Sequence, residues 1–149
     1  MSDAGHIAVH EFEGSLIAVI QIELSDSVIE RFRADLLAEI RRRSAPSLIV
    51  DVSGLEVMDL HEFEQLRRIF RMAQIMGCRS ILAGLQPGVV AALVQLDADT
   101  DGLETVLSVE HAVNLLRREA DESAIDEDRL EPDVAAGDGD EVPAEEQHG

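Results

Sequence analysis

The residues of this chain that could carry out chemistry are few, and they do not gather into a recognisable catalytic set. Cys78 is the only cysteine, which excludes an internal disulfide and a cysteine-based zinc site. The histidines are scattered along the chain without the spacing of metal ligands: His6, His10, His61, His111 and His148. We find no Ser–His–acid arrangement and no paired carboxylates at a plausible strand end. We therefore expect no catalytic residues, no metal, no cofactor and no enzymatic activity.

Four polar features remain as candidates for function, and each also has a structural interpretation. Asp59 precedes an apolar-periodic segment, where its carboxylate can cap a helix or contact a partner. His61 could titrate near neutral pH, but an exposed helical histidine often has no special role. Ser53 lies in a turn, where we expect its hydroxyl to bond to nearby backbone. The loop Gly84–Gly88 lacks the pattern of a phosphate-binding loop, so a rigid turn is the simpler interpretation.

Composition and charge narrow the class of partner. The formal net charge of −19 argues against binding to nucleic acid or to anionic lipid, and favours proteins with basic or apolar surfaces. Hydrophobic residues make up 46% of the chain, enough for a core. Aromatic residues are scarce, so we expect an aliphatic core whose only large rings are Phe12, Phe32, Phe63 and Phe70. The sequence shows no signal peptide and no membrane-spanning apolar run, which predicts a cytoplasmic protein.

A change in composition near residue 120 divides the chain. Residues 121–149 hold twelve acidic residues against Arg129 alone. A segment this charged has too little apolar surface to offset its ordering entropy. We therefore predict one folded domain over residues 1–120 and a disordered acidic C-terminal tail over residues 121–149.

Strands and helices alternate within the predicted domain. Gly14 separates two strands in a hairpin, and Ser25 or Asp26 can cap the first helix. The expected elements, in chain order, are strands 6–13 and 15–22, helix 26–43, strand 47–52, helix 60–76, strand 80–83, a short helix ending near Leu96, strand 105–107 and a helix from Ser108 to about Arg118. This order predicts an α/β fold in which helices cover a mixed β-sheet.

Several stretches of this sequence resemble one family. The segment from Leu48 to Asp59, LIVDVSGLEVMD, resembles the STAS domain of anti-sigma factor antagonists. Four further stretches are similar to its RsbS branch: Ile20–Asp26, the helix end Met76-Gly77, Leu82–Pro87 and Leu93–Leu96. The resemblance covers about residues 5–118 and implies a single STAS domain.

The resemblance also implies a function. RsbS-like proteins are non-catalytic scaffolds in a cytoplasmic stress-response particle, the stressosome. There they co-assemble with RsbR-type STAS sensors and sequester an RsbT-type serine/threonine kinase. The alternatives are a one-to-one partner-switching anti-sigma factor antagonist and a small α/β ligand-binding domain.

One position departs from the pattern of the family. RsbS-like proteins carry a phosphorylated serine directly after an aspartate at the start of the second helix. Here Asp59 is present, but the next residue is Leu60, which has no hydroxyl. The chain is then either a non-switching subunit or uses another hydroxyl, for which Ser53 is the candidate. The resemblance also makes Asp59, an exposed Leu60 and His61 candidate contacts for the kinase or a neighbouring subunit.

Overall fold

A five-stranded mixed sheet forms the centre of the fold, as the sequence predicts. The computed structural model describes the backbone of residues 6–146 and the side chains of residues 6–128. The strands are β1 (Val9–Phe12), β2 (Ser15–Val19), β3 (Ser47–Asp51), β4 (Arg79–Ala83) and β5 (Glu104–Val106), and they lie in this order across the sheet. β1 pairs antiparallel with β2, and the other neighbouring pairs are parallel.

The β1–β2 hairpin turns at the position that Gly14 predicts. Phe12 pairs with Ser15, so the loop is two residues long. Its residues, Glu13 and Gly14, both have positive φ, at 53° and 85°. Two successive positive φ angles characterise the turn that matches the twist of paired strands, and glycine adopts them without strain.

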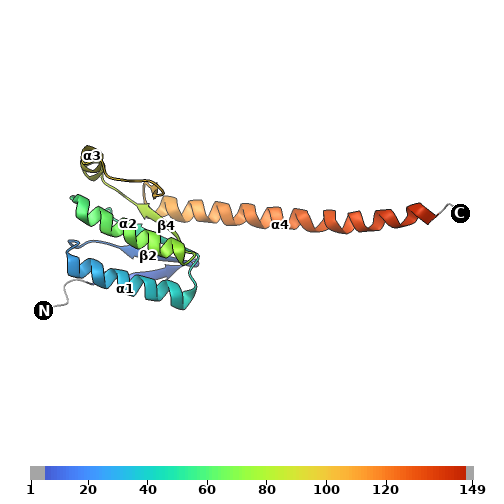
Figure 1. The fold of residues 1–149 in the computed structure, drawn as a ribbon, viewed down its shortest axis with the longest axis horizontal. Helices are drawn as coiled ribbons and strands as arrows, with labels where there is room; N and C mark the ends of the chain where they lie inside the picture. The colour runs from blue at the N-terminus through green and yellow to red at the C-terminus, as the bar shows by residue number, and fades with distance from the viewer. Residues whose placement is uncertain (1–5, 147–149) are drawn as a thin grey trace. The chain divides into compact units, whose positions relative to one another are not determined.

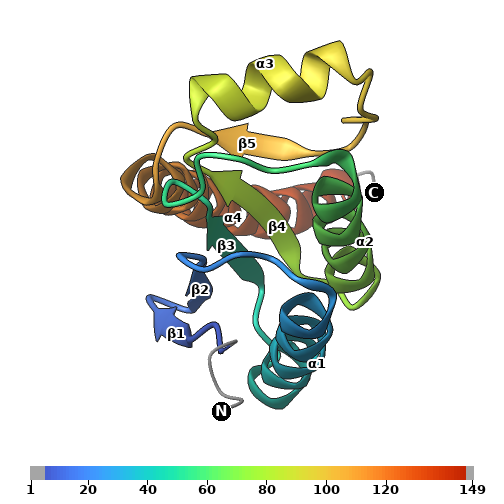
Figure 2. The same cartoon turned by 90° about the vertical axis from the view of Figure 1, so that its left-hand side faces the viewer.

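Three helices connect the parallel strands: α1 (Asp26–Arg43), α2 (Leu60–Ile75) and α3 (Pro87–Gln95). Each connection moves one strand further in the same direction, and right-handed crossovers then bring α1 and α2 to one face of the sheet. Figures 1 and 2 show α1 and α2 side by side, and Figure 2 shows α3 next to the edge strand β5. No helix within the described residues is long and apolar enough to cross a membrane.

An aliphatic core lies between the sheet and these helices. Alternate residues of the inner strands point into it, among them Leu48, Val50 and Leu82, each at most 1% exposed. Phe32, Phe63 and Phe70 are buried as expected. The prediction for Phe12 is wrong, because this ring is 45% exposed on the edge strand β1.

The last helix, α4, spans Val109–Glu146 and begins at the predicted place. Ser108 Oγ accepts a hydrogen bond from the backbone N–H of His111 at 3.2 Å, which caps the first turn. The sequence places the helix end near Arg118, but α4 continues, since residues 119–131 contain neither glycine nor proline. The chain divides into two compact units, Met1–Ala112 and Val113–Gly149. The disorder predicted for residues 121–149 stays a prediction, because the side chains from residue 129 onward lie outside the described residues.

Candidate functional site

The start of α2 is held by a reciprocal pair of hydrogen bonds. Asp59 Oδ1 accepts a bond from the backbone N–H of Glu62 at 2.8 Å. Glu62 Oε1 in turn accepts a bond from the backbone N–H of Asp59 at 3.0 Å. This capping box satisfies two donors that would otherwise lack partners, so it fixes where α2 begins. The capping role expected of Asp59 is confirmed.

His61 joins the start of α2 to the start of α1. Its Nε2 lies 3.0 Å from Asp26 Oδ1, although the two residues are 35 positions apart in the sequence. The hydrogen bond that the imidazole donates to Asp26 is the main reason that the pKa of His61 is raised, and the charges of Asp26, Asp59 and Glu64 add to it. Asp59 and His61 are therefore both engaged within the chain, on one exposed surface that also carries Asp26.

Leu60 occupies the first helical position of α2, between these two polar residues. The resemblance implies an exposed side chain, but Leu60 is half-buried. An apolar side chain gains free energy by packing against its surroundings, which accounts for this partial burial. Position 60 thus lacks the hydroxyl that a phosphate acceptor needs.

Ser53 lies beyond the carboxyl end of β3, in a turn braced by the neighbouring loop. Its backbone N–H donates to Asp51 Oδ1 at 2.9 Å, and its carbonyl oxygen accepts from Gln86 Nε2 at 2.7 Å. Gly84 approaches closely from the end of β4, with φ at +84°. A Cβ on Gly84 would lie 2.8 Å from Ser53 Cβ, so only glycine fits there.

The Ser53 hydroxyl itself does not make the turn. The sequence predicts that this hydroxyl bonds to nearby backbone. Within the described residues, however, Ser53 Oγ makes no hydrogen bond. The side chain of Asp51 holds the turn in its place, and the Ser53 residue is exposed. This leaves an accessible hydroxyl on a rigid backbone.

Cys78 is a packed thiol rather than a reactive one. It is 1% exposed, and burial raises its pKa to about 11. A thiol with such a pKa is almost entirely protonated near neutral pH, and the protonated form is a poor nucleophile. Cys78 therefore serves as a structural residue of the core.

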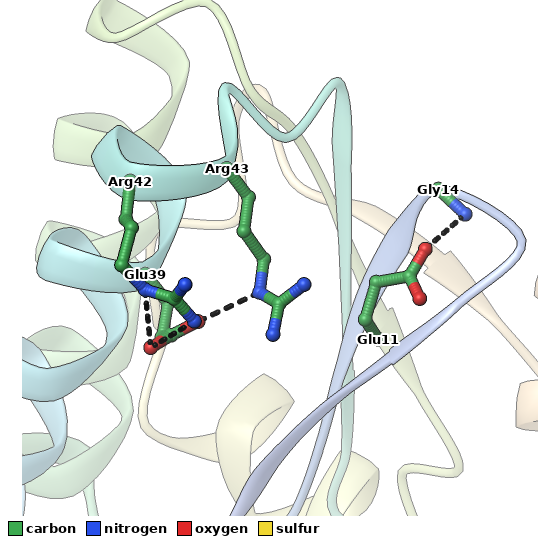
Figure 3. Close-up of polar contacts among 5 residues, drawn as sticks. All are labelled: Glu11, Gly14, Glu39, Arg42 and Arg43. Carbon is green, nitrogen blue, oxygen red and sulfur yellow. Dashed lines mark hydrogen bonds and ion pairs between the residues drawn. The ribbon is translucent and has the colours of Figure 1, made fainter.

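A cluster of basic residues lies at the end of α1, away from the start of the helix. Figure 3 shows Glu39 between Arg42 and Arg43, with Arg43 Nε 2.8 Å and Arg42 Nη2 2.9 Å from Glu39 Oε1. Hydrogen bonds from Arg43 and then Arg42 lower the pKa of Glu39. Three consecutive arginines, Arg41–Arg43, also suit the negative end of the helix dipole. These contacts stabilise the end of α1.

The fold and the features of this surface define a STAS domain. The model of the STAS domain family matches residues 6–112, and the chain belongs to that family. Among curated proteins, the chain is 25% identical over 99 residues to the RsbT co-antagonist protein RsbRB of Bacillus subtilis. That match covers 66% of this chain but only 34% of RsbRB, so the chain spans about a third of its relative's length.

Several solved structures that resemble this fold are stressosome proteins or anti-sigma factor antagonists. A serine-to-glutamate variant of RsbS from Moorella thermoacetica has a TM-score of 0.67 and 26% identity, over 76% of this chain and 97% of that one. A structure of the stressosome, described as a signal integration and transduction hub, matches with the same TM-score and identity. The anti-sigma factor antagonist SpoIIAA, at 17% identity and a TM-score of 0.60, shares the fold. These similarities indicate a signalling role, as a scaffold or in partner switching.

Sequence reasoning identified Asp59, Leu60, His61 and Ser53, and the structure brings the first three together at the start of α2. It missed Asp26 as the partner of His61, and Asp51 and Gln86 as the residues that hold the Ser53 turn. Pairings of residues more than 30 positions apart leave no periodicity in a sequence, so no local signal could have revealed His61–Asp26 or Gln86–Ser53.

Proposed function

We propose that this chain is a non-catalytic, RsbS-like scaffold subunit. In this proposal it co-assembles with RsbR-type STAS sensors and holds an RsbT-type serine/threonine kinase. The observation that carries the proposal is the likeness to RsbS, which extends over 97% of that protein's chain at 26% identity. The similarity to RsbRB supports a sensor of that type as the assembly partner.

The surface at the start of α2 serves as the contact for the kinase in this proposal. Asp59 and His61 are exposed there, and their hydrogen bonds fix the geometry of the surface before any partner arrives. A preorganised surface loses less conformational entropy on binding, which favours a stable complex. Leu60 adds an apolar group and removes the hydroxyl on which the usual switch depends.

Without a hydroxyl at position 60, the kinase cannot release itself by modifying that position. A phosphate would add about −1.5 to −2 charge beside the helix start, and Leu60 cannot accept it. The chain therefore acts as a subunit that holds the kinase without switching. Phosphorylation of Ser53 is the competing possibility, because its hydroxyl is exposed and makes no hydrogen bond within the described residues.

Kinase assays with ATP separate these two possibilities. The cognate kinase is incubated with the wild-type chain, with Ser53→Ala and with Leu60→Ser, and the products are mapped by mass spectrometry. We expect no phosphate on the wild-type chain and phosphate on Leu60→Ser alone. Phosphate on Ser53 of the wild-type chain, together with faster release of the kinase, would show that the subunit switches through another hydroxyl.

The assembly itself is tested by particle mass. Light scattering is measured on the chain alone, on an RsbR-type sensor from the same organism alone, and on their mixture. We expect a megadalton-scale particle in the mixture that contains both proteins. If the chain stays monomeric or dimeric in every sample, the scaffold proposal fails and a one-to-one antagonist takes its place.

A further inference from the structure

The short helix α3 presents an unusually apolar surface to solvent. It contains no charged residue along its nine positions. Val89 and Leu93 pack into the core, whereas Val90 and Val94 are 42% and 73% exposed. Val90 and Val94 are four positions apart, so they form a stripe along the outer side of the helix. Leu96, which ends the helix, is a further apolar residue in water and is 50% exposed.

A hollow lies beside this stripe. Its volume is about 510 Å³, and its apolar lining includes Phe63, Leu85 and Leu93 together with Val90 and Val94. Phe63 and Leu93 are 1% and 4% exposed, so the floor of the hollow is the protein core itself. An apolar side chain inserted here would leave water and contact a preformed surface, which is the arrangement that anchors a partner.

One charge marks the rim of the hollow. Asp97 is the only charged residue in its lining, beside the polar residues Thr100 and Thr105. Asp99, further along the same loop, is bound to Arg67 at 3.3 Å, but Asp97 forms no ion pair within the described residues. A carboxylate at the edge of an apolar surface attracts a cation on the partner and sets the orientation of that partner.

These observations favour a protein segment over other occupants. Leu96 lies outside the lining of the hollow, so a small molecule confined there would leave Leu96 in water, whereas a protein segment laid across the hollow and the end of α3 could cover both. A second copy of this chain is disfavoured, because each copy carries a net charge of −19.

We propose that α3 and the adjoining hollow form a docking surface for a partner protein segment. The segment places apolar side chains on Val90 and Val94 and pairs an arginine or lysine with Asp97. This surface is distinct from the start of α2, and its use does not depend on whether the chain joins a stressosome-like particle.

A designed peptide probes the surface directly in the full-length chain. The peptide is an amphipathic helix of about four turns, with a leucine stripe flanked by a single arginine. Two companion peptides replace the leucines by serine or the arginine by glutamate. Binding is measured by fluorescence anisotropy at two salt concentrations, and the contact residues are mapped by NMR chemical shifts.

Two variants and two matched controls locate the binding site. Val94→Ser removes apolar surface from the stripe, and Asp97→Asn removes the charge while tolerating the positive φ of 57° at that position. Ile75→Ser removes an 87% exposed aliphatic side chain elsewhere, and Glu56→Gln removes an exposed carboxylate elsewhere. Circular dichroism confirms that each variant folds.

We expect Val94→Ser to lower the affinity for the leucine–arginine peptide about five- to tenfold. Asp97→Asn should lower this affinity about two- to fivefold. The two controls leave the affinity unchanged, and the shifted resonances fall on α3. Equal binding of the serine peptide would overturn the proposal, because charge alone would then explain the affinity. The proposal also fails if Val94→Ser dissolves a dimer of the chain or releases a bound small molecule, or if it has no more effect than Ile75→Ser.

Discussion

The start of α2 and the outer face of α3 differ in whether their side chains already have partners within the chain. At the start of α2, Asp59 and His61 have partners within the chain, at 2.8 Å and 3.0 Å. On α3, Val90 and Val94 remain in water, and the helix start has no side-chain cap. Polar groups that are already bonded gain little from a partner, whereas exposed apolar groups gain from every contact that removes water. The first surface therefore fixes geometry, and the second offers binding free energy.

The largest expected effect comes from a core residue of α2 that also forms the floor of the hollow beside α3. Phe63 belongs to α2, is 1% exposed and lines the hollow beside α3. Phe63→Ala should lower the free energy of unfolding by about 3–5 kcal/mol, because it leaves a cavity in the core. Urea denaturation followed by circular dichroism measures the loss. A change below 1 kcal/mol would mean that the two surfaces do not rest on a common core.

A glycine substitution tests how firmly the turn between the two surfaces is braced. Gly84→Ala should lower the free energy of unfolding by about 1–3 kcal/mol, since the residue has positive φ and its Cβ would meet Ser53. Gly88→Ala is the matched control in α3, where an added Cβ meets nothing within 4 Å. The control should be neutral or stabilising by about 0.5 kcal/mol. Equal effects of the two substitutions would contradict the close approach at Gly84.

The N-terminal caps of α2 and α1 allow a comparison of how much each cap contributes to the free energy of unfolding. Asp59→Ala removes a 2.8 Å hydrogen bond and one half of a capping box, and should cost about 1 kcal/mol. Ser25 caps α1 through a longer contact, 3.4 Å from the backbone N–H of Val28. Ser25→Ala should therefore cost less, about 0.5 kcal/mol. Chemical denaturation of both variants ranks the two, and the reverse order would show that the capping box adds nothing.

The smallest expected effect is a pH-dependent one at the tie between α1 and α2. Because Asp26 raises the pKa of His61, the tie stabilises the fold at pH values below the normal pKa of histidine and is lost as the pH rises through the raised value. Asp26→Asn should return the pKa of His61 toward its usual range. NMR titration of the His61 imidazole resonances in the wild-type chain and in the variant measures this change. An unchanged pKa would mean that the pair does not persist in solution.

The sequence alone determined most of the fold, because its signals are local. The spacing of Phe32 and Leu36 predicts the buried side of α1, and Gly14 and Ser25 set a turn and a helix start through their own backbone preferences. The same reasoning placed Asp59 as a cap and showed that Leu60 cannot accept a phosphate. It was wrong for Phe12, because successive residues of the edge strand β1 are exposed and nothing in the local pattern marks β1 as an edge.

Only the tertiary structure decided which distant groups meet. The sheet brings the ends of β3 and β4 together, so that Asp51 and Gln86 hold the Ser53 turn and leave its hydroxyl unbonded within the described residues. The packing of α1 beside α2 pairs Asp26 with His61, and the loop after α3 places Asp97 at the rim of an apolar hollow. Local propensity sets where helices and strands begin and end, whereas the properties of these sites arise from packing between segments that are far apart in the chain.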